Sequence, residues 1–157
     1  HLIPLYCLLF TMPGIPSVYY GSEWGIPGRR LPGSDAPLRP VLDLTQAKSF
    51  PHPELAGWVA ALSGLRRRYP ALCSGEYQEL LVAHEQFAFM RRHPQMPVVV
   101  AVNSAASSID IDLHLPLENG TLEDILNPGS TIPITAGRTP VFIPPAGARI
   151  LAVRTGS

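Results

Sequence analysis

The second half of the chain alternates between apolar and polar residues, and this alternation limits the possible fold most strongly. Between residues 109 and 115, four apolar side chains at alternate positions are separated by Asp110, Asp112 and His114. A period of two places successive side chains on opposite faces of a strand, so one face lies in a core and the other in water. Residues 98–102, VVVAV, are apolar throughout and should lie at the centre of a sheet.

Similar short segments follow one another to the end of the chain, separated by turn signals such as Asn119-Gly120 and Pro128-Gly129. Short strands at a spacing of roughly ten residues are typical of an antiparallel sandwich or barrel. The predicted strands are 77–83, 86–92, 98–103, 109–115, 122–126, 131–134, 141–143 and 148–154.

The sequence before these strands has the period of a helix. Residues 53–68 carry one apolar stripe made of Leu55, Trp58, Val59, Leu62 and Leu65. The basic run 66–68 complements the negative end of this helix and is interpreted as a solvated helix end. Because the period changes from 3.6 to 2 after Pro70, we expect two domains, residues 1–72 and 73–157.

The first fifty residues combine an apolar run with a long irregular segment. Residues 1–11, HLIPLYCLLFT, predict a helix buried on all faces, and Met12-Pro13-Gly14 ends it. Residues 15–20 predict a short buried strand. Residues 21–51 are rich in Gly and Pro, and a loop of about thirty residues is usually functional when it is not disordered.

Composition excludes several classes of protein. The 157 residues are 46% apolar and 15% charged, which suits a folded core. The 12 basic and 12 acidic residues balance, so we expect neither a nucleic-acid partner nor a membrane partner. Cys7 and Cys73 cannot form a disulfide framework, and Cys7 suits a buried apolar position. The histidines lack metal-ligand spacing, so no metal site or cofactor is expected.

The start of the chain gives no targeting information. His1 leads directly into an apolar run, without the charged region and cleavage site of a signal peptide. We therefore expect the sequence to begin inside a longer chain. The compartment is left open, with the cytoplasm favoured.

Residues 12–25, MPGIPSVYYGSEWG, resemble the segment at the last barrel strand of the α-amylase family, glycoside hydrolase family 13. The downstream order is also similar: an Asp-x-x-x-Arg loop, an amphipathic helix and a small β domain called domain C. The segments LCSGEY (72–77) and FAFMR (87–91) resemble the first strands of that domain. The resemblance implies an α+β chain, in which the last helix-strand-helix portion of a (β/α)₈ TIM barrel precedes an antiparallel Greek-key β-sandwich.

The same resemblance implies a function for the parent protein. Family members cleave α-glucosidic bonds with an Asp nucleophile, an acid/base Glu and a second Asp. Retention of configuration requires two carboxyl groups roughly 5–5.5 Å apart. This chain carries none of the three catalytic motifs, so no catalytic residue is assigned. We expect the C-terminal fragment of an α-glucan-acting retaining hydrolase, inactive by itself.

The resemblance assigns sugar contacts to Asp35 and Arg39 in the loop. A carboxylate accepts from sugar hydroxyls, and a guanidinium donates several bonds in a fixed geometry. The alternative is an Asp that caps a turn and an Arg that pairs with it. Trp24 either stacks on a sugar or packs under the loop. Tyr20 and Glu23 are expected to be structural residues near the site, with Glu23 making hydrogen bonds.

Two other interpretations stay open. The chain could be a non-catalytic β-sandwich that binds glucan or mediates assembly, with the N-terminal segment as a docking arm. It could also be an unrelated β domain that matches by chance. The expected partners are an α-glucan or maltooligosaccharide in the parent enzyme and the rest of the barrel. A barrel segment without its neighbours exposes apolar faces, so we expect altered packing onto the β domain or self-association.

Overall fold

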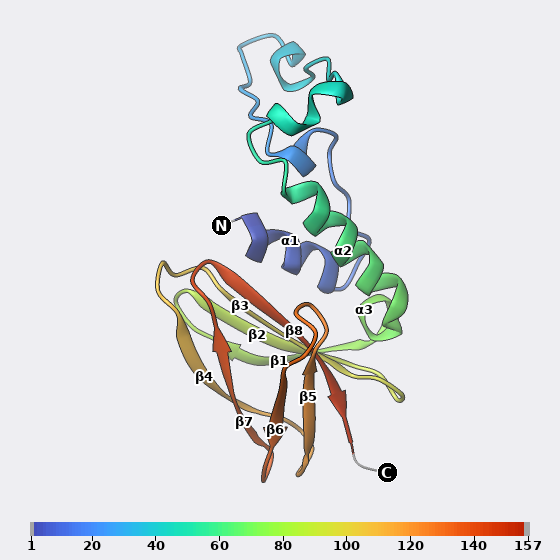
Figure 1. Ribbon diagram of the computed structural model, residues 1–157, viewed down its shortest axis with the longest axis vertical. Helices are drawn as coiled ribbons and strands as arrows, with labels where there is room; N and C mark the ends of the chain where they lie inside the picture. The colour runs from blue at the N-terminus through green and yellow to red at the C-terminus, as the bar shows by residue number, and fades with distance from the viewer. Residues whose placement is uncertain (1, 156–157) are drawn as a thin grey trace.

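The computed structural model describes residues 2–155 and has a β domain at one end and a long loop at the other (Figure 1). The helices lie between them. They are α1 (Leu2–Thr11), α2 (Leu55–Arg68) and α3 (Pro70–Ser74), with the short 3₁₀ turns η1 (Ser22–Trp24), η2 (Ala36–Leu38) and η3 (Leu44–Ser49) in the loop. Within the described residues, no helix is long and apolar enough to cross a membrane.

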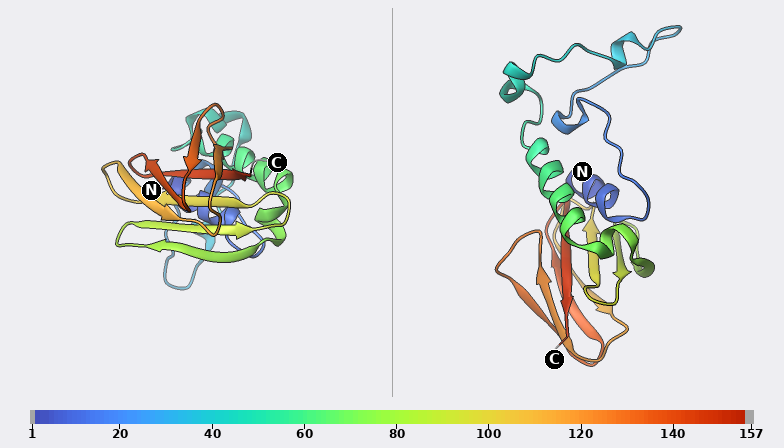
Figure 2. Two further views of the ribbon diagram at one scale, coloured as in Figure 1. Left: turned by 90° about the horizontal axis from the view of Figure 1, so that it is seen from below. Right: turned by 90° about the vertical axis from the view of Figure 1, so that its right-hand side faces the viewer.

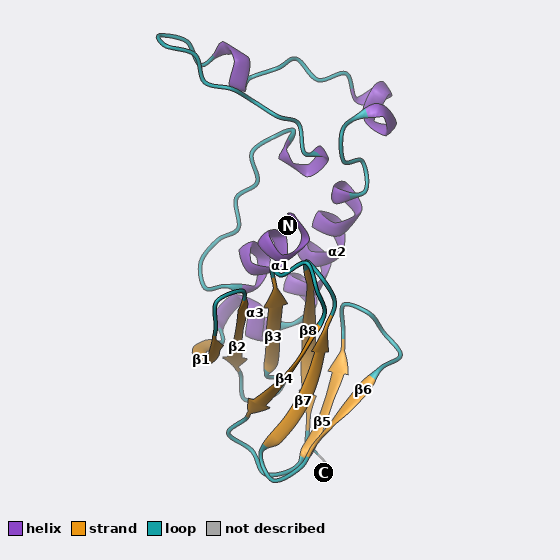
Figure 3. Ribbon diagram, turned by 90° about the vertical axis from the view of Figure 1, so that its left-hand side faces the viewer, coloured by secondary structure: helices purple, strands orange, loops and turns teal. Residues whose placement is uncertain are grey.

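Within the described part of the chain, eight strands form the β domain, which confirms the predicted antiparallel sandwich (Figure 3). The larger sheet has the order β1-β2-β3-β8-β5-β6, and β4 pairs with β7 in a second sheet. All of these pairs are antiparallel. The strands are β1 (Glu76–Val82), β2 (Gln86–Arg92), β3 (Val98–Asn103), β4 (Ile109–His114), β5 (Gly120–Asp124), β6 (Thr131–Ile134), β7 (Arg138–Ile143) and β8 (Gly147–Arg154).

Residues 98–102 of strand β3 are all apolar because both faces of this strand are covered. Val98 and Val100 belong to a core beneath the helices, whereas Val99 and Ala101 belong to a core between the two sheets. Strand β4 has one face toward the core between the sheets and the other toward solvent, so Ile111 and Leu113 are buried and the alternate polar residues are exposed. The structure confirms that residues 98–102 lie in a central strand and that the strand from residue 109 has one solvent-exposed face.

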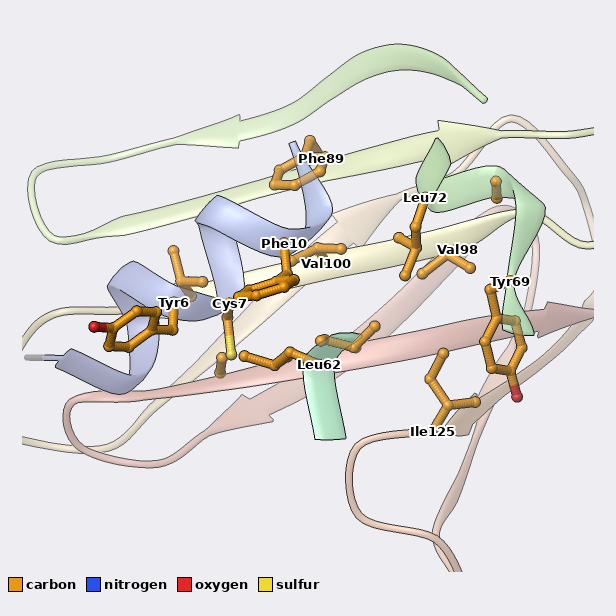
Figure 4. Packing of buried hydrophobic residues seen from close by; sticks show 14 of the residues in the cluster. Tyr6, Cys7, Phe10, Leu62, Tyr69, Leu72, Phe89, Val98, Val100 and Ile125 are labelled. Carbon is orange, nitrogen blue, oxygen red and sulfur yellow. The ribbon is translucent and has the colours of Figure 1, made fainter. Parts of the chain in front are cut away.

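The helices cover the outer face of the larger sheet (Figure 4). Cys7 and Phe10 of α1 and Leu62 of α2 pack in one core with Val98 and Val100. The structure confirms the predicted helix 53–68 from Leu55 onward. Element α3 spans the predicted boundary at residue 72, and the division into domains remains a prediction.

Two predictions for the N-terminal segment are wrong. Helix α1 is not buried on all faces, since Leu2 and Leu5 are 36% and 58% exposed. Residues 15–20 form no strand, and Ile15 is 95% exposed. A strand needs a hydrogen-bonded neighbour, and every strand of the two described sheets lies between residues 76 and 154. The described residues therefore show helices α1 and α2 without a strand between them, and the barrel portion of the predicted fold is not confirmed.

The basic run at the end of α2 is solvated only in part. Arg67 and Arg68 are exposed, but the Arg66 guanidinium donates to the carbonyl oxygens of Phe10 and Met12 at the end of α1. The interpretation of the whole run as a solvated helix end is therefore wrong for Arg66. Its partners lie more than fifty residues earlier in the chain, beyond the reach of helical periodicity.

Candidate functional site

The loop between α1 and α2 extends away from the β domain and returns to the start of α2 (Figure 2). Two hydrogen bonds hold η1 at its base: the Tyr6 hydroxyl donates to the Ser22 carbonyl at 2.7 Å, and the His52 amide donates to the Trp24 carbonyl at 2.9 Å. Gly21 and Gly25 flank η1 with φ angles of 87° and 64°. These left-handed conformations favour glycine and allow the chain to reverse tightly.

Two adjacent cavities lie against this part of the loop, and Tyr20, Arg39 and Pro40 line both. The first has a volume of about 410 Å³ and also includes Asp35 in its lining. The second has a volume of about 510 Å³ and also includes Glu23 and Trp24. The structure thus brings all five predicted site residues to one part of the loop. Their roles remain predictions.

Asp35 forms an ion pair with Arg30, which the sequence did not indicate as its partner. Its Oδ1 atom lies 3.2 Å from Arg30 Nε, and the two side chains are 51% and 80% exposed. The alternative pairing of Asp35 with Arg39 is absent among the described residues. Asp35 precedes η2, but its side chain does not cap that turn. Among residues 2–155, the Arg39 guanidinium is in no ion pair, although it lines both cavities.

Tyr19 and Tyr20 form an aromatic wall of the first cavity. Their ring centroids are 4.8 Å apart at an interplanar angle of 47°. The Tyr20 hydroxyl donates to the Pro40 carbonyl at 3.2 Å, which joins the wall to the segment after Arg39. Desolvation raises the pKa of Tyr20 and Tyr19 raises it further, while Arg39 opposes the shift, so the phenol is a neutral donor near neutral pH. Tyr19 was not among the predicted site residues, and the signal that could have indicated it is its position next to Tyr20 in the sequence.

Trp24 packs inside the loop. Its ring meets the Phe50 ring edge-on with the centroids 5.5 Å apart, which agrees with the packing alternative. The same residue also lines the second cavity.

Glu23 differs from the expected hydrogen-bonded structural residue. Its Oε2 atom is buried and has no hydrogen-bond partner among the described residues. Buried polar atoms nearly always have a partner, so this atom marks a place where a partner belongs. The pKa of Tyr6 is raised mainly by desolvation, and the nearby charge of Glu23 raises it further.

Arg91 is the functional candidate that sequence reasoning missed. It lies in β2, is 1% exposed, and donates to the Thr11 carbonyl at 2.6 Å. Its signal in the sequence was a charged residue that directly follows the apolar run FAFM (87–90) of the predicted strand. No group of three His, Cys, Asp or Glu residues within residues 2–155 could hold a metal ion.

Comparison with known proteins identifies the β domain. Residues 77–150 match the family model described as Maltogenic Amylase, C-terminal domain. The α-amylase of Niallia circulans is 29% identical over 121 residues, which are 76% of this chain and 21% of the relative. A cyclomaltodextrin glucanotransferase of Bacillus licheniformis is 27% identical over 158 residues, covering 96% of this chain and 21% of the relative.

Solved structures share the fold over nearly the whole chain. The α-amylase of Geobacillus thermoleovorans, complexed with acarbose, superposes with a TM-score of 0.84 at 23% identity, covering 98% of this chain and 33% of that protein. Ttha1563 of Thermus thermophilus gives a TM-score of 0.78 at 25% identity, covering 97% of this chain and 30% of that protein. The chain spans only 21% of the length of each of the two curated relatives.

The fold and the family model define the class of this domain as an amylase C-terminal β domain. Residues 77–150 are thus similar to the C-terminal domain found in enzymes of the α-amylase family, glycoside hydrolase family 13.

Proposed function

We propose that this chain is the C-terminal part of a retaining hydrolase that acts on α-glucans such as starch and maltooligosaccharides. Residues 1–72 would supply the end of the catalytic barrel, and residues 73–157 the β domain. The relatives named above are α-amylases and cyclomaltodextrin glucanotransferases, which supports this substrate class. One of the similar structures was solved with acarbose and another with maltotriose.

The observation that carries the proposal is the cavity that Tyr20, Asp35 and Arg39 share. Sugar rings present apolar faces and a rim of hydroxyl groups. Tyr19 and Tyr20 offer aromatic surface, Arg39 offers free donors, and Asp35 accepts hydrogen bonds. Asp35 and Arg39 would hold sugar and cleave nothing, because this sequence carries none of the three catalytic motifs.

The exposed apolar side chains of the N-terminal segment support its placement in a barrel. Most of the large exposed hydrophobic residues lie in residues 2–44: Leu2, Leu5, Ile15, Tyr19, Tyr20, Leu31, Val41 and Leu44. A surface of this kind marks an interface. The rest of the barrel would cover it, pair with residues 15–20 and offer a partner to Glu23.

Titration of the chain with maltoheptaose by NMR tests the site. We expect shifts at Tyr20, Asp35 and Arg39, and binding at least about fivefold weaker in Asp35→Asn and Arg39→Met. Arg29→Met is the matched control, because Arg29 is an exposed arginine of the same loop that lines neither cavity. Binding that is equal in all four proteins would place the glucan elsewhere and favour the non-catalytic module.

Two further measurements test the relation to the parent enzyme. The pure chain should release no reducing sugar from maltooligosaccharides, and detectable release would contradict the absence of catalytic residues. Light scattering tests self-association through the exposed segment. A monodisperse monomer with slow hydrogen exchange at residues 15–20 would instead favour packing of this segment onto its own chain.

A further inference from the structure

Arg66 on α2 holds the carbonyl groups where α1 ends. Its Nη1 atom donates to Phe10 at 2.8 Å and to Met12 at 3.4 Å, and its Nη2 atom donates to Gly14. The last carbonyl groups of a helix lack partners within the helix and form the negative end of its dipole. A guanidinium group fits this end because it is positively charged and donates in several directions.

Arg91 on β2 reaches the same end of α1 from the β domain. Its Nη1 atom donates to the Thr11 carbonyl at 2.6 Å. Its Nε and Nη2 atoms donate to the Gly75 carbonyl at 3.2 and 2.9 Å. Burial, and secondarily the charge of Arg66, lower the pKa of Arg91, which nevertheless stays protonated at neutral pH. One buried side chain thus joins the end of α1 to the residue before β1.

The segment that carries the aromatic wall begins directly after these carbonyl groups. Residues 15–19 make no backbone ladder with any described strand. The next fixed points are the Ser22 and Trp24 carbonyls, held by Tyr6 and by the His52 amide. The wall therefore spans two anchors, and the two arginines form the first of them.

The structure assigns Arg66 and Arg91 as positioning residues for the glucan site, an inference that rests on the proposed function. They form a guanidinium clamp, defined here as Arg66 and Arg91 with the carbonyl groups of residues 10–12, 14 and 75. The clamp fixes where the segment with Tyr19 and Tyr20 leaves the helical layer. Through Arg91, the β domain sets the geometry of a cavity that it does not line.

Conservative substitutions in the 157-residue chain test the clamp. Arg66→Met and Arg91→Met remove the donors, whereas Arg66→Lys and Arg91→Lys keep one cationic donor. Arg67→Met and Arg92→Met are the matched controls, because these arginines are exposed neighbours on the same helix and strand. The readouts are the maltoheptaose dissociation constant and the backbone chemical shifts of residues 10–25. Urea unfolding establishes that each variant is fully folded under the conditions of the titration.

We expect the dissociation constant to rise about fivefold or more in the two Met variants, with displaced shifts across residues 10–25, and less in the Lys variants. The controls should bind like the wild type. A purely stabilising role would lower the unfolding free energy and leave the dissociation constant of the folded fraction unchanged, which would overturn the inference. If Arg91→Met does not fold, Arg66→Met and the Lys variants decide the outcome.

Failure of the proposed function is distinguishable from failure of the clamp. If the wild-type chain binds no maltoheptaose, the glucan site is wrong and the clamp is judged on the chemical shifts alone. Displaced shifts of residues 15–25 in Arg66→Met then support positioning of the loop. Wild-type shifts there in folded Arg66→Met and Arg91→Lys overturn it.

Discussion

Arg149 Nη1 lies 2.7 Å from Oδ2 of Asp124, whose side chain is 1% exposed. The same carboxylate accepts from the backbone amides of Leu126 and Asn127 at 2.9 and 2.8 Å. One buried anion therefore fixes the turn after β5 and joins it to β8. Each of its bonds is charge-assisted, which makes it stronger than a neutral hydrogen bond.

Replacement of Asp124 by Ala should lower the free energy of unfolding by about 3–5 kcal/mol, because the partners of a buried charge lose their acceptor. Asp112→Ala is the matched control. It breaks the 2.8 Å pair between Asp112 and Arg138, whose side chains are 51% and 60% exposed. That loss should stay below about 1 kcal/mol. Urea unfolding measures both, and equal losses would contradict the assigned role of Asp124.

Leu62→Ala tests the core that joins α2 to the β domain. Leu62 is 1% exposed, so its truncation should leave a cavity and cost about 2–5 kcal/mol. Leu44 is 63% exposed in the loop, and Leu44→Ala should change stability by less than about 0.5 kcal/mol. A loss at Leu62 as small as that at Leu44 would show that the helical layer is not packed on the sheet.

The buried Cys7 thiol should make the stability of the chain depend on pH. Burial raises the pKa of Cys7 from 9.0 to about 12, so the folded state holds a proton that the unfolded state releases. The contribution of the protonated thiol to the free energy of unfolding is fully present below pH 9. It is lost as the pH rises from 9 toward 12, and the free energy of unfolding falls by up to about 1.4 kcal/mol per pH unit in this range. Cys7→Ala should remove this part of the slope. An unchanged slope in Cys7→Ala would show that Cys7 ionises equally in both states.

The two thiols should also differ in reactivity. Cys73 is exposed and Cys7 is buried, so a thiol reagent should modify Cys73 rapidly and Cys7 only after unfolding. The measurement is the number of fast-reacting thiols in the native chain, with Cys73→Ser as the variant that should abolish the fast phase. A fast phase that persists in Cys73→Ser would show that the α1 core opens readily.

Gly25→Ala tests the turn at the base of the site. Gly25 has a φ angle of 64°, and an added Cβ would lie 2.6 Å from Cδ2 of His52. The strain should cost about 1–3 kcal/mol and speed hydrogen exchange of the Ile26 amide, which donates to the Gly21 carbonyl at 3.0 Å. Gly33→Ala is the matched control, since its φ angle of 76° is similar but no atom lies within 4 Å. Equal Ile26 exchange in both variants would show that contact with His52 is unimportant.

Local periodicity accounts for the parts of the fold that could be predicted. The apolar stripe of α2 and the alternation in β4 are properties of short windows, and the structure confirms both. Residues 15–20 have the composition of a strand, but a strand also requires a neighbour. That neighbour is absent from the described sheets, so the composition alone was misleading.

The candidate site was predictable only as a set of residues. The resemblance directed attention to Tyr20, Glu23, Trp24, Asp35 and Arg39, and the structure places all of them along two adjacent cavities. Their individual partners could not be predicted. Asp35 pairs with Arg30, and Trp24 meets Phe50, because the loop reverses at its glycines and brings these side chains together.

The sequence by itself determined the β-sandwich, the amphipathic helix and the resemblance to a family, since each is encoded in periodicity or in a short motif. Only the tertiary structure decided that Arg66 and Arg91 hold the end of α1. Arg91 and Thr11 are 80 positions apart, and no local pattern relates a guanidinium to a carbonyl at that separation. Folding brings them within 2.6 Å because α1 lies across the sheet that contains β2, and the buried carbonyl then requires a donor.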